Sequence, residues 1–92
     1  MGWKLPLLTP REVQANLRAL GFVHKRTCGS HEQWVRQAEG TQAWARVTVD
    51  VGKAQFSKRL MKYMIRESLL SAEEFCSGVM KPRIVPAVVK ER

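Results

Sequence analysis

The stretch AWARVTVDV, residues 43–51, alternates between two kinds of side chain. Ala45, Val47, Val49 and Val51 are apolar, whereas most of the residues between them are polar. Because successive side chains of a strand point to opposite faces, this alternation is typical of an antiparallel strand with one buried face. The stretch therefore predicts a sheet that packs one face against the rest of the chain and leaves the other face polar.

Two further candidate strands precede this one. Residues 22–27 and residues 31–37 are separated by turn-forming residues 28–30 (CGS), and residues 39–41 (EGT) form a second turn before the last strand. Short runs between such turns are typical of hairpin strands. The central part of the chain therefore predicts a three-stranded antiparallel meander.

A helix is predicted on the N-terminal side of the strands. Thr9 can cap it, Pro10 suits its first position, and Glu12 can complete a capping box. Gly21 is a natural left-handed stop, so the helix is expected over residues 10–20. One apolar stripe recurs at helical spacing: Val13, Leu17 and Leu20.

A second helix is predicted to begin near Ser57, and a second capping box at residues 71–74 opens one short turn that ends at Gly78. The apolar face of the helix consists of Leu60, Met61, Met64 and Ile65. Its opposite face is basic and consists of Lys58, Arg59, Lys62 and Arg66. The order helix, three strands, helix predicts an α+β domain with both helices on one face of the sheet.

The composition limits the partners and the kinds of site. The 92 residues suffice for one domain, and 16 Lys and Arg against 8 Asp and Glu give a formal charge of +8. Such a charge favours a polyanion or an acidic protein as partner, although a merely solubilising charge is the alternative. The chain has no apolar run long enough for a membrane span and no secretory signal, which predicts a cytoplasmic protein without membrane contact. Two distant cysteines and two histidines, in no ligand spacing, predict no metal site and no cofactor.

Several motifs in a fixed order resemble one known family. They are residues 20–22 (LGF), Arg26, residues 29–34 (GSHEQW), residues 46–49 (RVTV) and residues 69–75 (LLSAEEF). This set is similar to the HicA family of toxin ribonucleases, in which a Gly-Ser-His motif begins the second strand. The resemblance covers roughly residues 9–76. The chain differs from the family at residues 50–53 (DVGK), where the family has a proline and a second histidine, and at Leu69, where the family has a small residue.

The resemblance implies a dsRBD-like fold of order α-β-β-β-α, which we assign to residues 1–78. Residues 79–92 extend beyond the usual end of the family, and their net positive charge predicts a basic C-terminal extension. It also implies the toxin of a type II toxin–antitoxin system, an endoribonuclease that cleaves mRNA and is neutralised by a HicB-like antitoxin. His31 is the catalytic histidine that the resemblance implies. For the extension, a frayed tail and an added edge strand both remain open.

The chemistry that residues near His31 can perform is phosphoryl transfer on RNA. Histidine suits an acid or base role near neutral pH, and cations stabilise the charge that develops on the phosphate. If residues 27–30 form a four-residue hairpin loop, Arg26 lies opposite His31 and His24 opposite Gln33. These four side chains then form one polar patch on the open face, with Val23 and Trp34 facing the helices.

The sequence thus predicts a metal-independent endoribonuclease with three catalytic residues: His31 as general acid or base, Arg26 for phosphate stabilisation and His24 as second proton-transfer group. The residues expected to contact RNA are Lys25, Ser30, Gln33, Lys58, Arg59, Lys62 and Arg66. Trp34 and Trp44 are predicted to pack in the core. Two alternatives stay open: a non-catalytic RNA-binding module, and a protein-interaction domain whose basic face meets an acidic partner.

Overall fold

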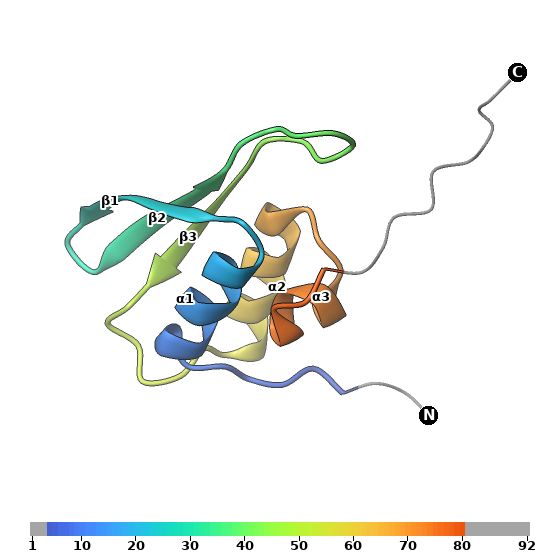
Figure 1. The fold of residues 1–92 in the computed structure, drawn as a ribbon. Helices are drawn as coiled ribbons and strands as arrows, with labels where there is room; N and C mark the ends of the chain where they lie inside the picture. The colour runs from blue at the N-terminus through green and yellow to red at the C-terminus, as the bar shows by residue number, and fades with distance from the viewer. Residues whose placement is uncertain (1–3, 81–92) are drawn as a thin grey trace, which may run out of the picture.

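The fold follows from a computed structural model, which describes residues 4–80. The elements along the chain are α1 (Pro10–Ala19), β1 (Val23–Cys28), β2 (His31–Arg36), β3 (Ala45–Asp50), α2 (Lys58–Ser68) and α3 (Ala72–Ser77). The strands form one antiparallel sheet in the order β1-β2-β3. The helices lie together on one side of this sheet (Figure 1). The predicted α+β class and the dsRBD-like α-β-β-β-α order are therefore confirmed, with α3 as a short additional helix.

Helix α1 begins and ends as predicted. The Thr9 side chain accepts a hydrogen bond from the Glu12 backbone N–H, and the Glu12 carboxylate accepts one from the Thr9 backbone N–H. These two bonds satisfy N–H groups that the first turn of a helix leaves without partners. Gly21 follows the helix with φ +93°, a conformation that favours glycine. The local sequence at both ends thus sets where this helix begins and ends.

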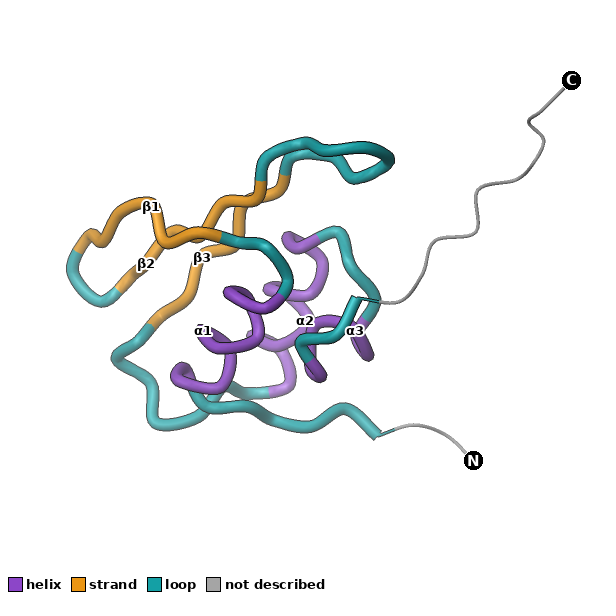
Figure 2. The backbone as a smooth tube through the Cα atoms, in the orientation of Figure 1, coloured by secondary structure: helices purple, strands orange, loops and turns teal. Residues whose placement is uncertain are grey.

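The alternation that predicted β3 also divides the sheet into two faces. Residues opposite each other on paired strands share a face, and the partners include Trp34 with Val47 and His31 with Asp50. The face toward the helices is buried and consists of Trp34, Arg36, Ala45, Val47 and Val49. The opposite face of β2 and β3 carries His31, Gln33, Thr48 and Asp50, and it is not covered by the helices. Figure 2 shows these strands on one side of the helical layer.

The core is built from all the elements except β1. It joins Val13 and Leu17 of α1 to Met61 of α2 and Phe75 of α3, each with at most 2% of its surface exposed. Trp34 is buried in this core as predicted, whereas Trp44 is 51% exposed, so the packing prediction is wrong for Trp44. In β1 every residue is exposed, so this strand lies at the edge of the sheet beyond the helices.

The β1–β2 hairpin differs from the prediction. Its loop is the two-residue turn Gly29-Ser30 rather than a four-residue loop, and Cys28 pairs with His31. Gly29 has φ +62° at the first position of the turn, where type II′ hairpin turns favour glycine. A bulge at Lys25 then shifts the register between His24 and Arg26. The predicted pairings of Arg26 with His31 and of His24 with Gln33 are therefore wrong.

Two further predictions concern a membrane and the C-terminal extension. No helix within residues 4–80 is long and apolar enough to cross a membrane. The predicted basic extension, residues 79–92, lies outside the described residues from residue 81 onward.

Candidate functional site

His31 is the first residue of β2, directly after the Gly29-Ser30 turn. Its side chain is 59% exposed on the face of the sheet that the helices leave uncovered. Asp50, the last residue of β3, lies opposite it, and the His31 Nε2 atom is 3.7 Å from Asp50 Oδ2. The site therefore combines a solvent-accessible imidazole with a carboxylate that faces one of its ring nitrogens.

The carboxylate of Asp50 is fixed by the chain around it. The Gly52 backbone N–H donates a hydrogen bond of 3.0 Å to Asp50 Oδ1, and the Ser30 hydroxyl donates a second. These two bonds, followed by the nearby His31 and Lys53, lower the pKa of Asp50 below its ordinary value. Asp50 is therefore ionised throughout the neutral range and presents a fixed negative charge to His31.

Asp50 is a site residue that sequence reasoning missed. It belongs to residues 50–53, which drew notice only because the second histidine of the resembled family is absent there. The alternation of β3 does place Asp50 on the polar face with Thr48. It does not show that Asp50 lies opposite His31, because that depends on the β2–β3 register. The register depends in turn on the irregular connection over residues 37–44 and cannot be read from alternation alone.

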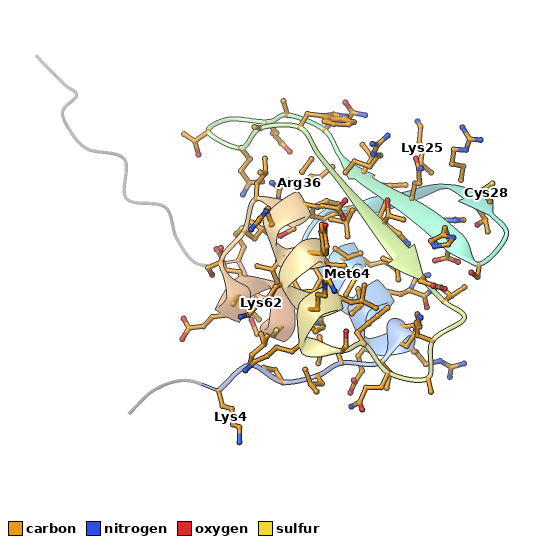
Figure 3. All side chains as sticks on the ribbon, turned by 180° about the vertical axis from the view of Figure 1, so that it is seen from behind. Lys4, Lys25, Cys28, Arg36, Lys62 and Met64 are labelled. Atoms are coloured by element: carbon orange, nitrogen blue, oxygen red, sulfur yellow. The ribbon has the colours of Figure 1, made fainter. Side chains whose placement is uncertain are left out.

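The structure brings together three of the four residues of the predicted polar patch. Arg26 pairs with Gln33, and Cys28 pairs with His31, so Arg26, Gln33 and His31 share the open face. Arg26 is a diagonal neighbour of His31 rather than its direct partner, a separation that a long side chain can bridge. Lys25 is exposed at the bulge beside this face, and Figure 3 shows Lys25 and Cys28 on the part of the hairpin that extends away from the helices.

His24 is the exception. It pairs with Trp34, and the two rings lie 5.4 Å apart on the helix side of the sheet. Its Nε2 atom is 2.7 Å from the Thr27 hydroxyl. The prediction that His24 shares a face with His31 is therefore wrong, because the bulge at Lys25 changes which side chains point to which face. Val23 changes face as well and is 65% exposed instead of facing the helices.

A groove extends from His31 along the edge of β3 to helix α2. It has a volume of about 320 Å³. The Glu67 carboxylate of α2 accepts a hydrogen bond of 3.2 Å from the Thr48 backbone N–H, so α2 covers the free edge of β3 and forms the far wall. The residues that line the groove are His31, Thr48, Asp50, Lys53, Phe56, Leu60, Tyr63, Met64 and Glu67.

The outer face of α2 carries the predicted basic residues. Met61 and Met64 are buried, and all four predicted basic side chains of this helix are exposed. Arg59, Lys62 and Arg66 surround a shallow hollow of about 250 Å³ together with Tyr63. Tyr63, which sequence reasoning did not single out, thus belongs both to this hollow and to the groove beside His31.

The remaining predicted contact, Ser30, has a structural role in the turn. Its carbonyl accepts a hydrogen bond of 2.8 Å from the Val51 N–H, and its hydroxyl binds Asp50. Within residues 4–80, no group of three or more His, Cys, Asp or Glu side chains is arranged to hold a metal ion.

No protein-family model and no curated protein matches this sequence. The site itself combines an exposed imidazole beside a fixed carboxylate with the cations of Arg26 and Lys53 and a groove that leads to a basic helix.

Proposed function

We propose that the protein is a cytoplasmic endoribonuclease that cleaves mRNA without a metal ion, the toxin of a type II toxin–antitoxin system. The observation that carries the proposal is the placement of His31 beside Asp50 at one end of a groove whose other end meets the basic face of α2. The resemblance of residues 29–34 and the other motifs to the HicA family points in the same direction. A HicB-like antitoxin would neutralise the toxin by covering this surface.

His31 would act in the cleavage as general base or acid. As base, His31 would take the proton of the ribose 2′-OH, whose oxygen attacks the adjacent phosphorus, and the bond to the 5′-oxygen would break as that oxygen takes a proton from water; as acid, His31 would supply this second proton and water would accept the first. The products are a 2′,3′-cyclic phosphate and a free 5′-OH. The Asp50 carboxylate would attract the Nε2 side of the ring, 3.7 Å away, and leave Nδ1 for the substrate.

Cations around the site would stabilise the charge of the pentacoordinate phosphorus. Arg26 shares the face of His31, and Lys53 lines the groove beside it, whereas Lys25 lies at the other end of the hairpin with Val23 and Val35. Positioned positive groups are effective because they require little reorganisation when charge develops. Further away, the basic face of α2 supplies contacts to the RNA backbone that do not depend on base sequence.

The test is a comparison of His31→Ala with His24→Ala, because both substitutions remove an exposed imidazole from the same hairpin. RNA is incubated with each purified protein in excess chelator, and folding is checked by circular dichroism. We expect His31→Ala to lose roughly 10²- to 10⁴-fold in cleavage rate and to stop inhibiting growth. We expect His24→Ala to remain active, because its ring faces the helix side. Cleavage by a folded His31→Ala protein at the wild-type rate would refute the assignment.

A non-catalytic RNA-binding module is the second candidate, and one observation favours it. Of the two histidines, only His31 lies on the open face, so a second imidazole for proton transfer is missing there. The same incubation distinguishes the two functions. A mobility shift of RNA without cleavage, under conditions in which the protein is folded, would support the binding module and contradict the nuclease.

A further inference from the structure

We propose that the groove between β3 and α2 binds one unpaired nucleotide of the RNA strand, with its base stacked on Tyr63. This inference rests on the proposed function in its substrate class, RNA, and adds the site that holds the nucleotide beside the scissile phosphate. It concerns a residue and a groove to which the motifs of the sequence assign no role.

The groove has the size and the surface for a flat aromatic ligand. Its volume of about 320 Å³ suits one nucleotide rather than a duplex. Its floor is apolar and consists of Phe56, Leu60 and Met64, of which Phe56 and Met64 are buried in the core and therefore fixed in position. A base that enters the groove must leave its own helical stack, and unpaired RNA offers such bases at the lowest energetic cost.

Tyr63 is placed to cover such a base. Its side chain is 57% exposed. It lies on α2 between the exposed Lys62 and the buried Met64, at the border between the basic face and the core. A large aromatic ring that remains in solvent at the border of a basic surface contributes little to the core. Proteins that bind single strands combine such rings with a basic path along the backbone, because every base has a face that can stack.

The charges around Tyr63 orient the nucleotide. Glu67 lines the part of the groove away from His31, so a phosphate is disfavoured in that part. Arg59, Lys62 and Arg66 lie on the other side of Tyr63, around the shallow hollow. The backbone is therefore expected to run from His31 across Lys53 toward these cations. The base then points inward, where carboxylates can accept hydrogen bonds from its amino groups.

The experiment measures binding of short unstructured RNAs by fluorescence anisotropy, using the full chain with His31→Ala to prevent cleavage. A set of pentanucleotides carries an abasic residue at each position in turn. We expect Tyr63→Ala to weaken binding of the intact strand by about tenfold, the effect of losing one stacked base. Tyr63→Phe keeps the ring and is expected to bind normally. Trp44→Ala is the matched control, because Trp44 is an exposed aromatic residue outside the groove.

The abasic strands separate stacking from a general loss of structure. With Tyr63 present, removal of the base at one position should weaken binding by a similar factor. In the Tyr63→Ala protein, removal of that same base should change the binding affinity little. The ring and the base contact each other, so the effects of removing the ring and removing the base are not additive. Equal sensitivity of both proteins to the abasic residue, or equal binding of the intact strand by both, would overturn the subsite.

The outcome for the subsite is distinguishable from the outcome for the nuclease. Wild-type protein that cleaves RNA while Tyr63→Ala binds and cleaves equally well would overturn the subsite and leave the nuclease in place. Binding that depends on Tyr63 and on one base, without cleavage by wild type, would support the subsite and refute the nuclease. A loss of binding with Trp44→Ala but not with Tyr63→Ala would place the stacking surface elsewhere and overturn the inference.

Discussion

The imidazole of His31 and the carboxylate of Asp50 face each other across β2 and β3, with 3.7 Å between Nε2 and Oδ2. The two residues are 19 positions apart in the sequence, and each stands at the end of its strand next to a turn. The turn at Ser30 and the turn at Gly52 both donate hydrogen bonds to Asp50. The strand ends and their turns thus form one unit that fixes the carboxylate toward the imidazole.

The first prediction concerns Asp50 in cleavage. Asp50→Asn keeps the shape of the side chain but removes the negative charge that lies 3.7 Å from the ring of His31. We expect the cleavage rate to fall, but by less than the roughly 10²- to 10⁴-fold loss expected for His31→Ala, because Asp50 does not itself transfer the proton. Single-turnover cleavage of a defined RNA measures this effect. An unchanged cleavage rate would mean that the pair has no role in the reaction.

The second prediction concerns the same residue and the pH dependence of stability. The pKa of Asp50 is lower in the folded protein than its ordinary value of 3.8, so its ionised form stabilises the fold at any pH above that value. This stabilisation is lost as the pH falls through the folded pKa. We therefore expect wild type to be more stable than Asp50→Asn at pH 7, and the difference to shrink below about pH 4.

Urea unfolding of both proteins between pH 7 and pH 3, followed by circular dichroism, measures this difference. The matched control is Glu39→Gln, because Glu39 is an exposed carboxylate in the β2–β3 connection. For Glu39→Gln we expect no comparable narrowing of the difference in unfolding free energy from wild type as the pH falls from 7 to 3. A constant difference between wild type and Asp50→Asn across the range would contradict the role of the ionised carboxylate.

The sequence alone predicted those features of the fold that depend only on residues close together in the chain. The capping box of Thr9 and Glu12, the stop at Gly21 and the alternation of Val47 and Val49 all act within a few positions, and all were predicted. The hairpin register was not predicted, because it depends on the number of residues in the turn and on the bulge at Lys25. Alternation has a period of two, so one additional residue reverses the faces of all that follow.

The candidate site was therefore predicted only in part. His31 was found through its motif, and Arg26 and Gln33 were placed on the correct face. His24 was assigned to the wrong face, and Asp50 was missed because its relation to His31 is a long-range one. Tyr63 was also missed, because a lone tyrosine in a basic helix becomes notable only once the groove beside it is known.

The third prediction concerns the basic face of α2. Lys62→Ala removes one cation from the hollow beside Tyr63, whereas Lys4→Ala removes one cation near the N-terminus. We expect Lys62→Ala to weaken RNA binding at all sequences and to reduce the slope of log K against log salt by about 0.7, the value for one phosphate contact with a single strand. Lys4→Ala should leave the slope unchanged. Equal slopes for both variants would show that the net charge alone, and not this face, attracts RNA.

The fourth prediction concerns Leu69, which ends helix α2 with φ +63° and ψ +18°. This left-handed conformation is unfavourable for leucine by roughly 1–2 kcal/mol, and glycine adopts it readily. Because the Leu69 side chain is 57% exposed, Leu69→Gly removes little buried surface. We expect Leu69→Gly to increase the free energy of unfolding by about 1 kcal/mol, which corresponds to a rise of about 4–8 °C in Tm for a domain of this size.

Leu69→Ala is the control, because it removes the same side chain but keeps a Cβ atom in the strained conformation. A fall in Tm for Leu69→Gly below that of Leu69→Ala would show that the leucine side chain stabilises the helix end by contacts that outweigh the backbone strain.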